Sequence, residues 1–202
     1  MTKEPIDCGF RSYPYTPPEK TMDNKLTGFD SLTSNTALPD GNWRLDRSLG
    51  YYIEDPQLVK QVDAFYEKYG KLLKHFKWDG KKLTATRGFI HDFASVPRPL
   101  WAFLSPTDIK RPAVTHDLWY ENLKALWWEG IITHAEWLKY RKLADLIFRE
   151  AMAYTEPRID RVRRAKAYRA VRTFGWYDRA MQRELRRANG RQPLQKKRGR
   201  RR

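Results

Sequence analysis

The sequence predicts an α+β fold, in which a small antiparallel β-sheet packs against a mostly helical C-terminal half. Two segments, 43–53 and 81–90, show the apolar–polar alternation of half-buried strands. Three longer segments, 110–123, 133–154 and 158–188, repeat apolar residues at helical spacing. With 202 residues and 41% hydrophobic content, the chain is large enough for one packed core with appendages.

The composition divides the chain into an arm, a domain and a tail. Residues 1–42 are rich in Pro, Gly, Ser, Asn and Asp without apolar periodicity, so we expect an N-terminal arm of loop or extended chain. Residues 43–188 contain the periodic segments and are expected to form a single globular domain. Residues 189–202 contain one apolar residue and are expected to be a disordered basic tail.

Turn residues indicate how the strand segments bend. Within 43–53, Trp43 and Leu45 alternate with polar neighbours, and Gly50 marks the bend of a strand or hairpin. The segment 71–90 has Asp79-Gly80 between two short apolar stretches, which predicts a second strand or hairpin.

Two helices carry clear signals where they begin. Asp55 is an N-cap residue and Pro56 occupies the first helical position, which predicts a helix over 56–69 as an insert in the domain. Thr133 is followed three residues later by Glu136, which is the spacing of a capping box at the start of the next-to-last helix.

Cysteine content and hydropathy exclude several classes of protein. Cys8 is the only cysteine, so an intrachain disulfide and a cysteine-based zinc motif are both excluded. No window approaches the roughly 20 apolar residues that span a bilayer, and the N-terminus has no apolar signal-peptide core. We therefore expect a protein without membrane insertion, made in a reducing cytoplasm.

The positive charge is concentrated at the C-terminal end of the chain. From residue 158 onward there are 18 Lys and Arg residues against three acidic ones, whereas residues 1–157 are nearly balanced. Such an arm can neutralise the phosphates of DNA or another polyanion, including an acidic protein surface, without reading sequence. The alternative is a solvated helix face. The candidate nucleic-acid-binding residues are Arg161, Arg163, Arg164, Arg169, Lys196, Lys197, Arg198 and Arg200.

The middle of the chain contains a candidate polar site on two neighbouring helices. His116 and Tyr120 are four residues apart and share a helix face, whereas Asp117 lies about 100° round from His116. Arg141 and Asp145 are also four residues apart, on the next helix. If the two helices pack antiparallel, these side chains meet in a polar cluster.

Two readings of this cluster stay open. In the functional reading, His116 is a general base on water, and Asp117 and Asp145 orient it or hold a hard divalent cation such as calcium or magnesium. Asp92 is a further candidate metal ligand, and the supporting residues are Ser95, Tyr120 and Arg141. In the structural reading, the same groups form a buried hydrogen-bond network that pins two helices together.

Smaller polar features have simpler expected roles. Asp92 follows a predicted strand and precedes Ser95, where an Asp commonly caps a turn. The remaining histidines, His75, His91 and His134, are expected to lie on the surface.

Four blocks of the sequence resemble the phage-associated domain-of-unknown-function 1353 family. They are GFIHDFASVPRPLW, AVTHDLWY, LADLIFREAM and AYRAVRTFGWY, and the resemblance covers about residues 43–177. Members of the family show a Gly-Phe-x-x-Asp-x-x-Ser-x-Pro stretch, a His-Asp-x-x-Tyr helix, an Ala-Asp-x-x-Phe helix and a closing Arg-x-x-Gly helix.

The resemblance implies a context more than an activity. It suggests a protein of tailed bacteriophages or prophages, encoded among virion or lysis genes. Carried over by position, the polar residues of the family are Asp92, Ser95, His116, Asp117, Tyr120 and Asp145. This chain departs from the pattern through its N-terminal arm, the helix at 56–69 and its Arg-rich tail.

A second, local likeness concerns the His-Asp-x-x-Tyr segment with its later Asp. It is similar to the active-site helices of secretory phospholipases, in which the His activates water and the adjacent Asp holds calcium. The flanking cysteines and the Gly-rich calcium loop of those enzymes are absent here.

Three hypotheses for function follow. The first is a non-enzymatic virion-associated protein of the tail or head–tail region, made in the host cytoplasm, whose arms contact nucleic acid or other phage structural proteins. The second is a small cation-assisted hydrolase that uses the His–Asp site. The third is a nucleic-acid-binding or host-interaction protein that uses residues 158–202. The sequence leaves open whether the chain is an enzyme.

Overall fold

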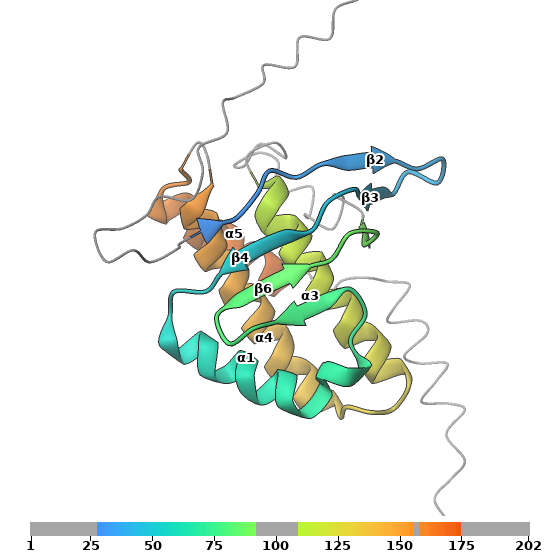
Figure 1. The fold of residues 1–202 in the computed structure, drawn as a ribbon. Coiled ribbons are helices and arrows are strands. Elements are labelled where there is room, and N and C mark those ends of the chain that lie inside the picture. Colours follow the sequence, from blue (N-terminus) through green and yellow to red (C-terminus); the bar gives the residue numbers. More distant parts are fainter. Residues whose placement is uncertain (1–27, 92–108, 156–157, 175–202) are drawn as a thin grey trace, which may run out of the picture.

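The computed structural model describes residues 28–91, 109–155 and 158–174 of the chain (Figure 1). Its fold is α+β, as the sequence predicts. The elements, in chain order, are β1 Gly28–Phe29, β2 Asn35–Ala37, β3 Trp43–Leu45, β4 Leu49–Tyr52, α1 Pro56–Tyr69, η1 Gly70–Leu72, β5 Phe76–Trp78, β6 Lys82–Ala85, β7 Ile90–His91, α3 Lys110–Trp128, α4 His134–Ala151, η3 Met152–Tyr154 and α5 Arg161–Phe174.

The strands form two antiparallel sheets where one small sheet was expected. The order of the first sheet is β1-β4-β6-β5 and that of the second is β2-β3-β7. The segment 43–53 supplies a strand to each sheet, because the chain bends between β3 and β4. At this bend Asp46 accepts hydrogen bonds from the hydroxyls of Ser34 and Thr36, at 3.4 and 2.8 Å. Residues 28–42, expected as loop or extended arm, contribute β1 and β2.

The hairpin expected at Asp79-Gly80 joins β5 to β6. The carboxylate of Asp79 accepts hydrogen bonds from the main-chain N–H groups of Lys81 and Lys82. Gly80 has a φ of 94°, a conformation that glycine adopts without strain. The turn places Leu83 of β6 opposite Trp78, so that both side chains enter the core.

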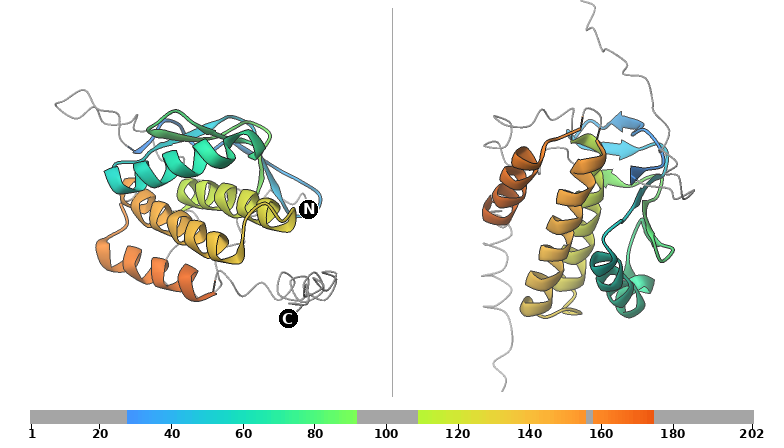
Figure 2. Two further views of the ribbon diagram at one scale, coloured as in Figure 1. Left: turned by 90° about the horizontal axis from the view of Figure 1, so that it is seen from below. Right: turned by 90° about the vertical axis from the view of Figure 1, so that its left-hand side faces the viewer.

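The helices are stacked in layers behind the sheets. Figure 2 shows the strands and α1 on one side of the molecule, the pair α3 and α4 next to them, and α5 outermost. The main core lies between the sheets, α1, α3 and α4. Its centre is Phe65 of α1, whose ring lies 4.8 Å from the ring of Trp119 and 4.7 Å from that of Tyr140.

The helix starts at Asp55 and Thr133 follow the sequence signals, whereas α4 ends at Ala151 before the predicted residue 154 and α5 begins at Arg161 after the predicted residue 158. Asp55 caps α1, and Thr133 and Glu136 form the predicted capping box of α4. The helix α3 continues to Trp128, past the predicted end at residue 123, because Leu126 is buried in the core. Gly130, with a φ of 71°, follows the end of this helix.

The last described helix, α5, packs on α4 through a second, smaller apolar cluster. The buried members of this cluster are Ile109, Phe148, Met152, Ile159, Ala167 and Val171. The predicted continuation of this helix to residue 188 lies outside the described residues. None of the helices in the described ranges has the length and apolar character to cross a membrane.

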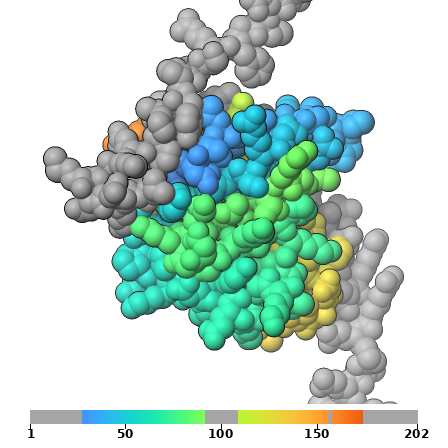
Figure 3. Space-filling model, viewed as in Figure 1, coloured from blue at the N-terminus to red at the C-terminus, as the bar shows by residue number. Residues whose placement is uncertain are grey.

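The face of the molecule in front of the helices is formed by the strands and α1. Figure 3 shows this face as a surface made mainly of the two sheets and the first helix, with part of the α3–α4 region, in yellow, at its lower right edge. The helices α3, α4 and α5 lie behind it, so a site between them belongs to a different side of the molecule.

Candidate functional site

The candidate site is centred on the carboxylate of Asp145, which is fully buried. Its Oδ1 accepts hydrogen bonds from Nε2 of His116 at 2.9 Å and from the hydroxyl of Tyr120 at 2.8 Å. Its Oδ2 accepts a hydrogen bond from Nη1 of Arg172 at 2.8 Å. Three helices therefore converge on one carboxylate, with α4 supplying Asp145, α3 supplying His116 and Tyr120, and α5 supplying Arg172.

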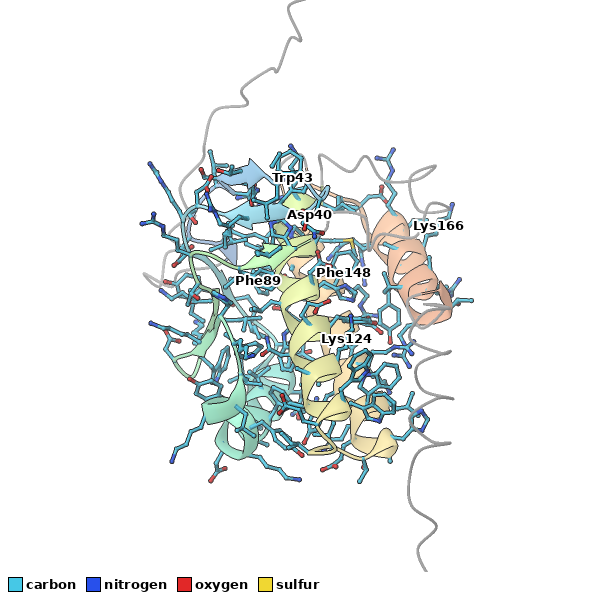
Figure 4. The ribbon with its side chains drawn as sticks, turned by 90° about the vertical axis from the view of Figure 1, so that its right-hand side faces the viewer. Asp40, Trp43, Phe89, Lys124, Phe148 and Lys166 are labelled. Carbon is cyan, nitrogen blue, oxygen red and sulfur yellow. The ribbon has the colours of Figure 1, made fainter. Side chains whose placement is uncertain are left out.

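The local folding of α3 and α4 explains this arrangement. The two helices pack side by side and are joined by a short link, so their polar faces meet. The ring of His116 is held between Tyr120, at 4.2 Å between ring centroids, and Phe148, at 4.9 Å. In Figure 4 the side chain of Phe148 lies between α3 and α5. Aromatic packing therefore fixes the plane of the imidazole.

A second arginine completes the cluster. Nε of Arg141 lies 3.9 Å from Oδ2 of Asp145. Nη2 of Arg141 donates a hydrogen bond to the main-chain oxygen of Arg172, and its guanidinium lies 5.4 Å from the ring centroid of Trp137. A buried carboxylate is costly unless it is paired and hydrogen-bonded, and here two guanidinium groups compensate it.

The environment sets the protonation of the acidic groups. Burial acts to raise the pKa of Asp145, but the hydrogen bonds from His116, Arg172 and Tyr120 outweigh burial, and the pKa is lowered. Burial and the neighbouring charge of Asp145 raise the pKa of Tyr120 well above its ordinary value. Asp145 is therefore ionised at neutral pH, and Tyr120 keeps its proton.

This protonation state fixes the roles of the two ring nitrogens of His116. Because Asp145 is an ionised acceptor, the Nε2 that it contacts carries the hydrogen. In the neutral imidazole Nδ1 then carries the lone pair, and within the described residues it makes no hydrogen bond. The side chain of His116 keeps 7% of its surface exposed. Such an imidazole has the geometry of a carboxylate-oriented general base.

The model of the family described as "Protein of unknown function (DUF1353)" matches residues 71–171, half of the chain. The chain belongs to the DUF1353 family. The expected resemblance over 43–177 was wider than this match, which begins after α1. No curated protein and no solved structure matches the chain.

The DUF1353 segment contains nearly all of the cluster. It includes α3 and α4 with His116, Tyr120, Arg141 and Asp145, and its last matched residue directly precedes Arg172. The strands β1, β3 and β4 and the helix α1 complete the core from outside the matched segment.

The predicted site residues divide into three groups. His116, Tyr120, Arg141 and Asp145 meet, as the helical spacing indicates. Asp117 is buried beside His116 in the chain. Asp92 and Ser95 lie outside the described residues, so their predicted roles stay predictions.

The predicted divalent cation also stays a prediction. Within the described ranges, His, Asp and Glu side chains form no group of three that is arranged to hold a metal ion. Both oxygens of Asp145 already accept hydrogen bonds, which suits this carboxylate to orienting His116. Asp117 and Asp92 stay predicted cation ligands.

Arg172 belongs to the cluster although it was not among the predicted site residues. It lies in the AYRAVRTFGWY block, as the Arg of the Arg-x-x-Gly pattern of the family. The Arg-x-x-Gly pattern could have identified Arg172. The sequence alone does not distinguish this arginine from the other arginines of the same helix. Its side chain is 30% exposed, so the cluster reaches the surface through this residue.

The other histidines are placed partly as expected. His75 and His134 are exposed, as predicted. The prediction for His91 was wrong, because this residue is buried on β7 and its Nε2 lies 3.0 Å from Oδ1 of Asn35. The burial arises because β7 pairs with β3, opposite Trp43.

The predicted nucleic-acid-binding residues are described only in α5. Arg161, Arg163 and Arg169 are exposed and Arg164 is half-buried. Arg163 pairs with Asp160 at 3.3 Å. The other candidates, Lys196, Lys197, Arg198 and Arg200, lie outside the described residues.

Proposed function

We propose that this DUF1353 protein is a small hydrolase in which His116 acts as the general base. The observation that carries the proposal is the contact of Nε2 of His116 with Asp145, which leaves Nδ1 without a hydrogen bond in the described part of the chain. A purely structural histidine gains most when both ring nitrogens are paired, because a buried polar atom without a partner is costly.

The proposed chemistry is the activation of a water molecule. Nδ1 takes a proton from water while the water oxygen attacks a carbonyl carbon or a phosphorus atom, and the leaving group departs with the electron pair of the broken bond. The positive charge that develops on His116 is stabilised by the ionised Asp145. Tyr120 and Arg172 hold this carboxylate in place.

The divalent cation predicted from the sequence is kept in this proposal with Asp117, which is buried, as one of its ligands. Together with Asp92, Asp117 would hold calcium or magnesium, and such an ion would polarise the bond that water attacks. The ligand set is therefore proposed as Asp117 and Asp92, while Asp145 serves the histidine.

The test compares His116→Gln with wild type in the full chain. A glutamine side-chain amide can still donate to Asp145, so we expect a cooperative fold, but it cannot act as a base. Hydrolysis should fall by a factor of about 10²–10⁴. The substrates are p-nitrophenyl esters, bis(p-nitrophenyl) phosphate, phospholipid vesicles and peptidoglycan, each with calcium, with magnesium and with a chelator.

His134→Gln is the matched control, because His134 is exposed and stacks on Trp137 outside the cluster. It should leave hydrolysis unchanged. Wild-type activity in a folded His116→Gln protein would overturn the proposal. So would an absence of activity on every substrate together with loss of the fold in His116→Gln, since the cluster would then be structural.

A second function is supported by the exposed arginines of α5. We propose that the protein is a phage virion-associated accessory protein of the tail or head–tail region, made in the host cytoplasm, whose basic C-terminal part contacts nucleic acid or neighbouring phage structural proteins. The support is that α5 presents Arg161, Arg163 and Arg169 to solvent. Mass spectrometry of purified virions should detect the chain, and virions without it would contradict this role.

A further inference from the structure

The outer sides of α4 and α5 carry basic residues next to each other. On α4, Lys142 and Arg149 are exposed and seven residues apart, which puts them on the same side of the helix. On α5, Arg161 and Arg169 are exposed. The guanidinium of Arg149 lies 5.1 Å from the ring centroid of Tyr168 on α5, so the basic side of α4 borders α5 directly. We call Lys142, Arg149, Arg161 and Arg169 the α4–α5 basic face.

The carboxylates of these helices do not neutralise this face. No acidic residue lies within α5. Of the three on α4, Asp145 is buried against Arg172, Glu150 accepts from the main-chain N–H of Glu54, and Glu136 pairs with Lys68. Asp145 is buried, and Glu136, although partly exposed, is engaged by Lys68 of α1. No residue of the basic face makes an ion pair with any described residue.

The shape of the face suits a run of phosphates. Residues seven or eight apart on a helix are separated by about 11–12 Å along the axis, and packed helices lie about 8–10 Å apart. Arg141 contacts Arg172 and Arg149 contacts Tyr168, so α4 and α5 run antiparallel, and Lys142 and Arg161 extend the face in opposite directions from Arg149 and Arg169. Four cations in such a row can contact several phosphates of one nucleic acid, whose strands carry a charge about every 3.4 Å. Three of the four are arginines, whose guanidinium groups match phosphate geometry.

The apolar content of the face does not suit a membrane surface. Helices that bind at a lipid interface bury Trp, Phe or Leu side chains beside their basic residues. Among the described side chains of α4 and α5, the exposed large apolar ones are Leu138, on the same side of α4 as Lys142, and Val162 of α5. Two separate aliphatic side chains are a small apolar area compared with that of an interfacial helix. Figure 4 shows another cation, Lys166, on the outer side of α5.

We infer that the α4–α5 basic face binds the phosphodiester backbone of nucleic acid, without reading its sequence. The inference rests on the polyanion-binding role proposed above for α5. The inference restricts the binding partner to nucleic acid. It also adds Lys142 and Arg149 of α4, which lie before the basic part of the chain that begins at residue 158.

The experiment measures binding of a short fluorescent DNA duplex of arbitrary sequence to the full chain by anisotropy, across a series of salt concentrations. The variant is Lys142→Gln with Arg149→Gln, and the matched control is Arg44→Gln with Lys77→Gln, two exposed cations of the sheets. We expect affinity to fall at least tenfold in the α4 variant. Its slope of log affinity against log salt should become shallower by about 1.8, because each phosphate contact contributes about 0.9. The control should bind within about twofold of wild type.

The possible failures are distinguishable. If the α4 variant binds like wild type while Arg161→Gln with Arg169→Gln weakens binding, the inference is overturned and the role of α5 survives. If the full chain binds no duplex at low salt, both proposals fail. Tighter binding to phosphatidylserine vesicles than to DNA would overturn the assignment to nucleic acid. Circular dichroism checks that each variant is folded.

Discussion

Arg172 of α5 donates a hydrogen bond to Asp145 of α4 at 2.8 Å, and its own main-chain oxygen accepts one from Arg141. The basic helix is thereby attached to the same carboxylate that orients His116. The polar cluster between α3 and α4 is thus also the polar anchor of α5.

The first prediction concerns the charge of Asp145. Asp145→Asn keeps the size of the side chain but leaves Arg172 and Arg141 without their buried counter-ion. We expect the free energy of unfolding to fall by about 3–5 kcal/mol, as for other broken buried ion pairs. Urea denaturation measures this change.

Asp160→Asn is the control for this prediction. Asp160 is exposed, pairs with Arg163 and caps the start of α5 through the N–H groups of Val162 and Arg163. Asparagine also caps helices, so the free energy of unfolding should change much less than in Asp145→Asn. Equal effects of the two substitutions would contradict a buried, compensated Asp145.

The second prediction concerns alkaline pH. Burial raises the pKa values of Tyr51 and Tyr120 well above their ordinary value of 10. The folded state therefore holds these protons more tightly than the unfolded state, so the stabilisation is complete below about pH 10 and is lost as pH rises above it. Unfolding midpoints measured above pH 10 should decline less steeply in Tyr120→Phe than in wild type. An identical decline would show that Tyr120 ionises freely.

The third prediction concerns acid pH. Hydrogen bonds from Lys68, from the main chain of Thr133 and from Tyr69 lower the pKa of Glu136 to about 2. The stabilisation is present above the unfolded pKa of about 4.5 and is lost as pH falls toward 2. The pKa of Asp145 is also lowered, so protonation of this group adds a further loss of stability below about pH 4. Thermal melts from pH 6 to pH 2 should show a weaker pH dependence in Glu136→Gln.

Glu136→Gln is suitable because glutamine can keep the capping box of α4. Glu129→Gln, at an exposed position after α3, is the control and should follow the wild-type pH dependence. If Glu136→Gln also follows it, the link from Lys68 of α1 to Glu136 of α4 has no effect on stability.

The fourth prediction concerns Asn122, a buried residue of α3. Its side-chain oxygen accepts from the main-chain N–H of Lys74 at 2.7 Å, and its amide nitrogen lies 3.0 Å from the main-chain oxygen of the same residue. Asn122→Ala leaves both groups of Lys74 without these bonds. We expect a loss of about 2 kcal/mol, because two hydrogen bonds worth about 1 kcal/mol each are removed. Urea denaturation measures this loss in Asn122→Ala. The comparison variant is Ala125→Gly, at an exposed position of the same helix, which reports the effect of helix propensity alone.

The sequence was most informative where local chemistry decides the structure. Asp55 and Thr133 begin their helices as predicted, and Asp79-Gly80 forms the predicted turn, because each acts through hydrogen bonds or backbone preferences of its immediate neighbours. The meeting of His116 with Asp145 was also predictable, since a short link forces two amphipathic helices to pack side by side.

The sequence was least informative where contacts between distant segments of the chain determine the structure. Arg172 reaches Asp145 only because of the rotation of α5, and an arginine-rich helix gives no sign of which arginine points inward. His91 is buried because β7 pairs with β3 and Asn35 approaches from a stretch without periodicity. The segment 43–53 is divided between two sheets, and this division likewise depends on the hydrogen bonds that Asp46 accepts from Ser34 and Thr36.

The small apolar cluster beneath α5 has a consequence for dynamics. The buried apolar side chains of this helix are few, with Ala167 and Val171 in the small cluster, and its remaining attachment is polar through Arg172, whereas α3 is embedded in the main core. The helix can therefore open as one unit at a cost below that of global unfolding, and amide hydrogen exchange should be faster in α5 than in α3. Each opening would release Arg172 from Asp145 and so free the carboxylate that orients His116.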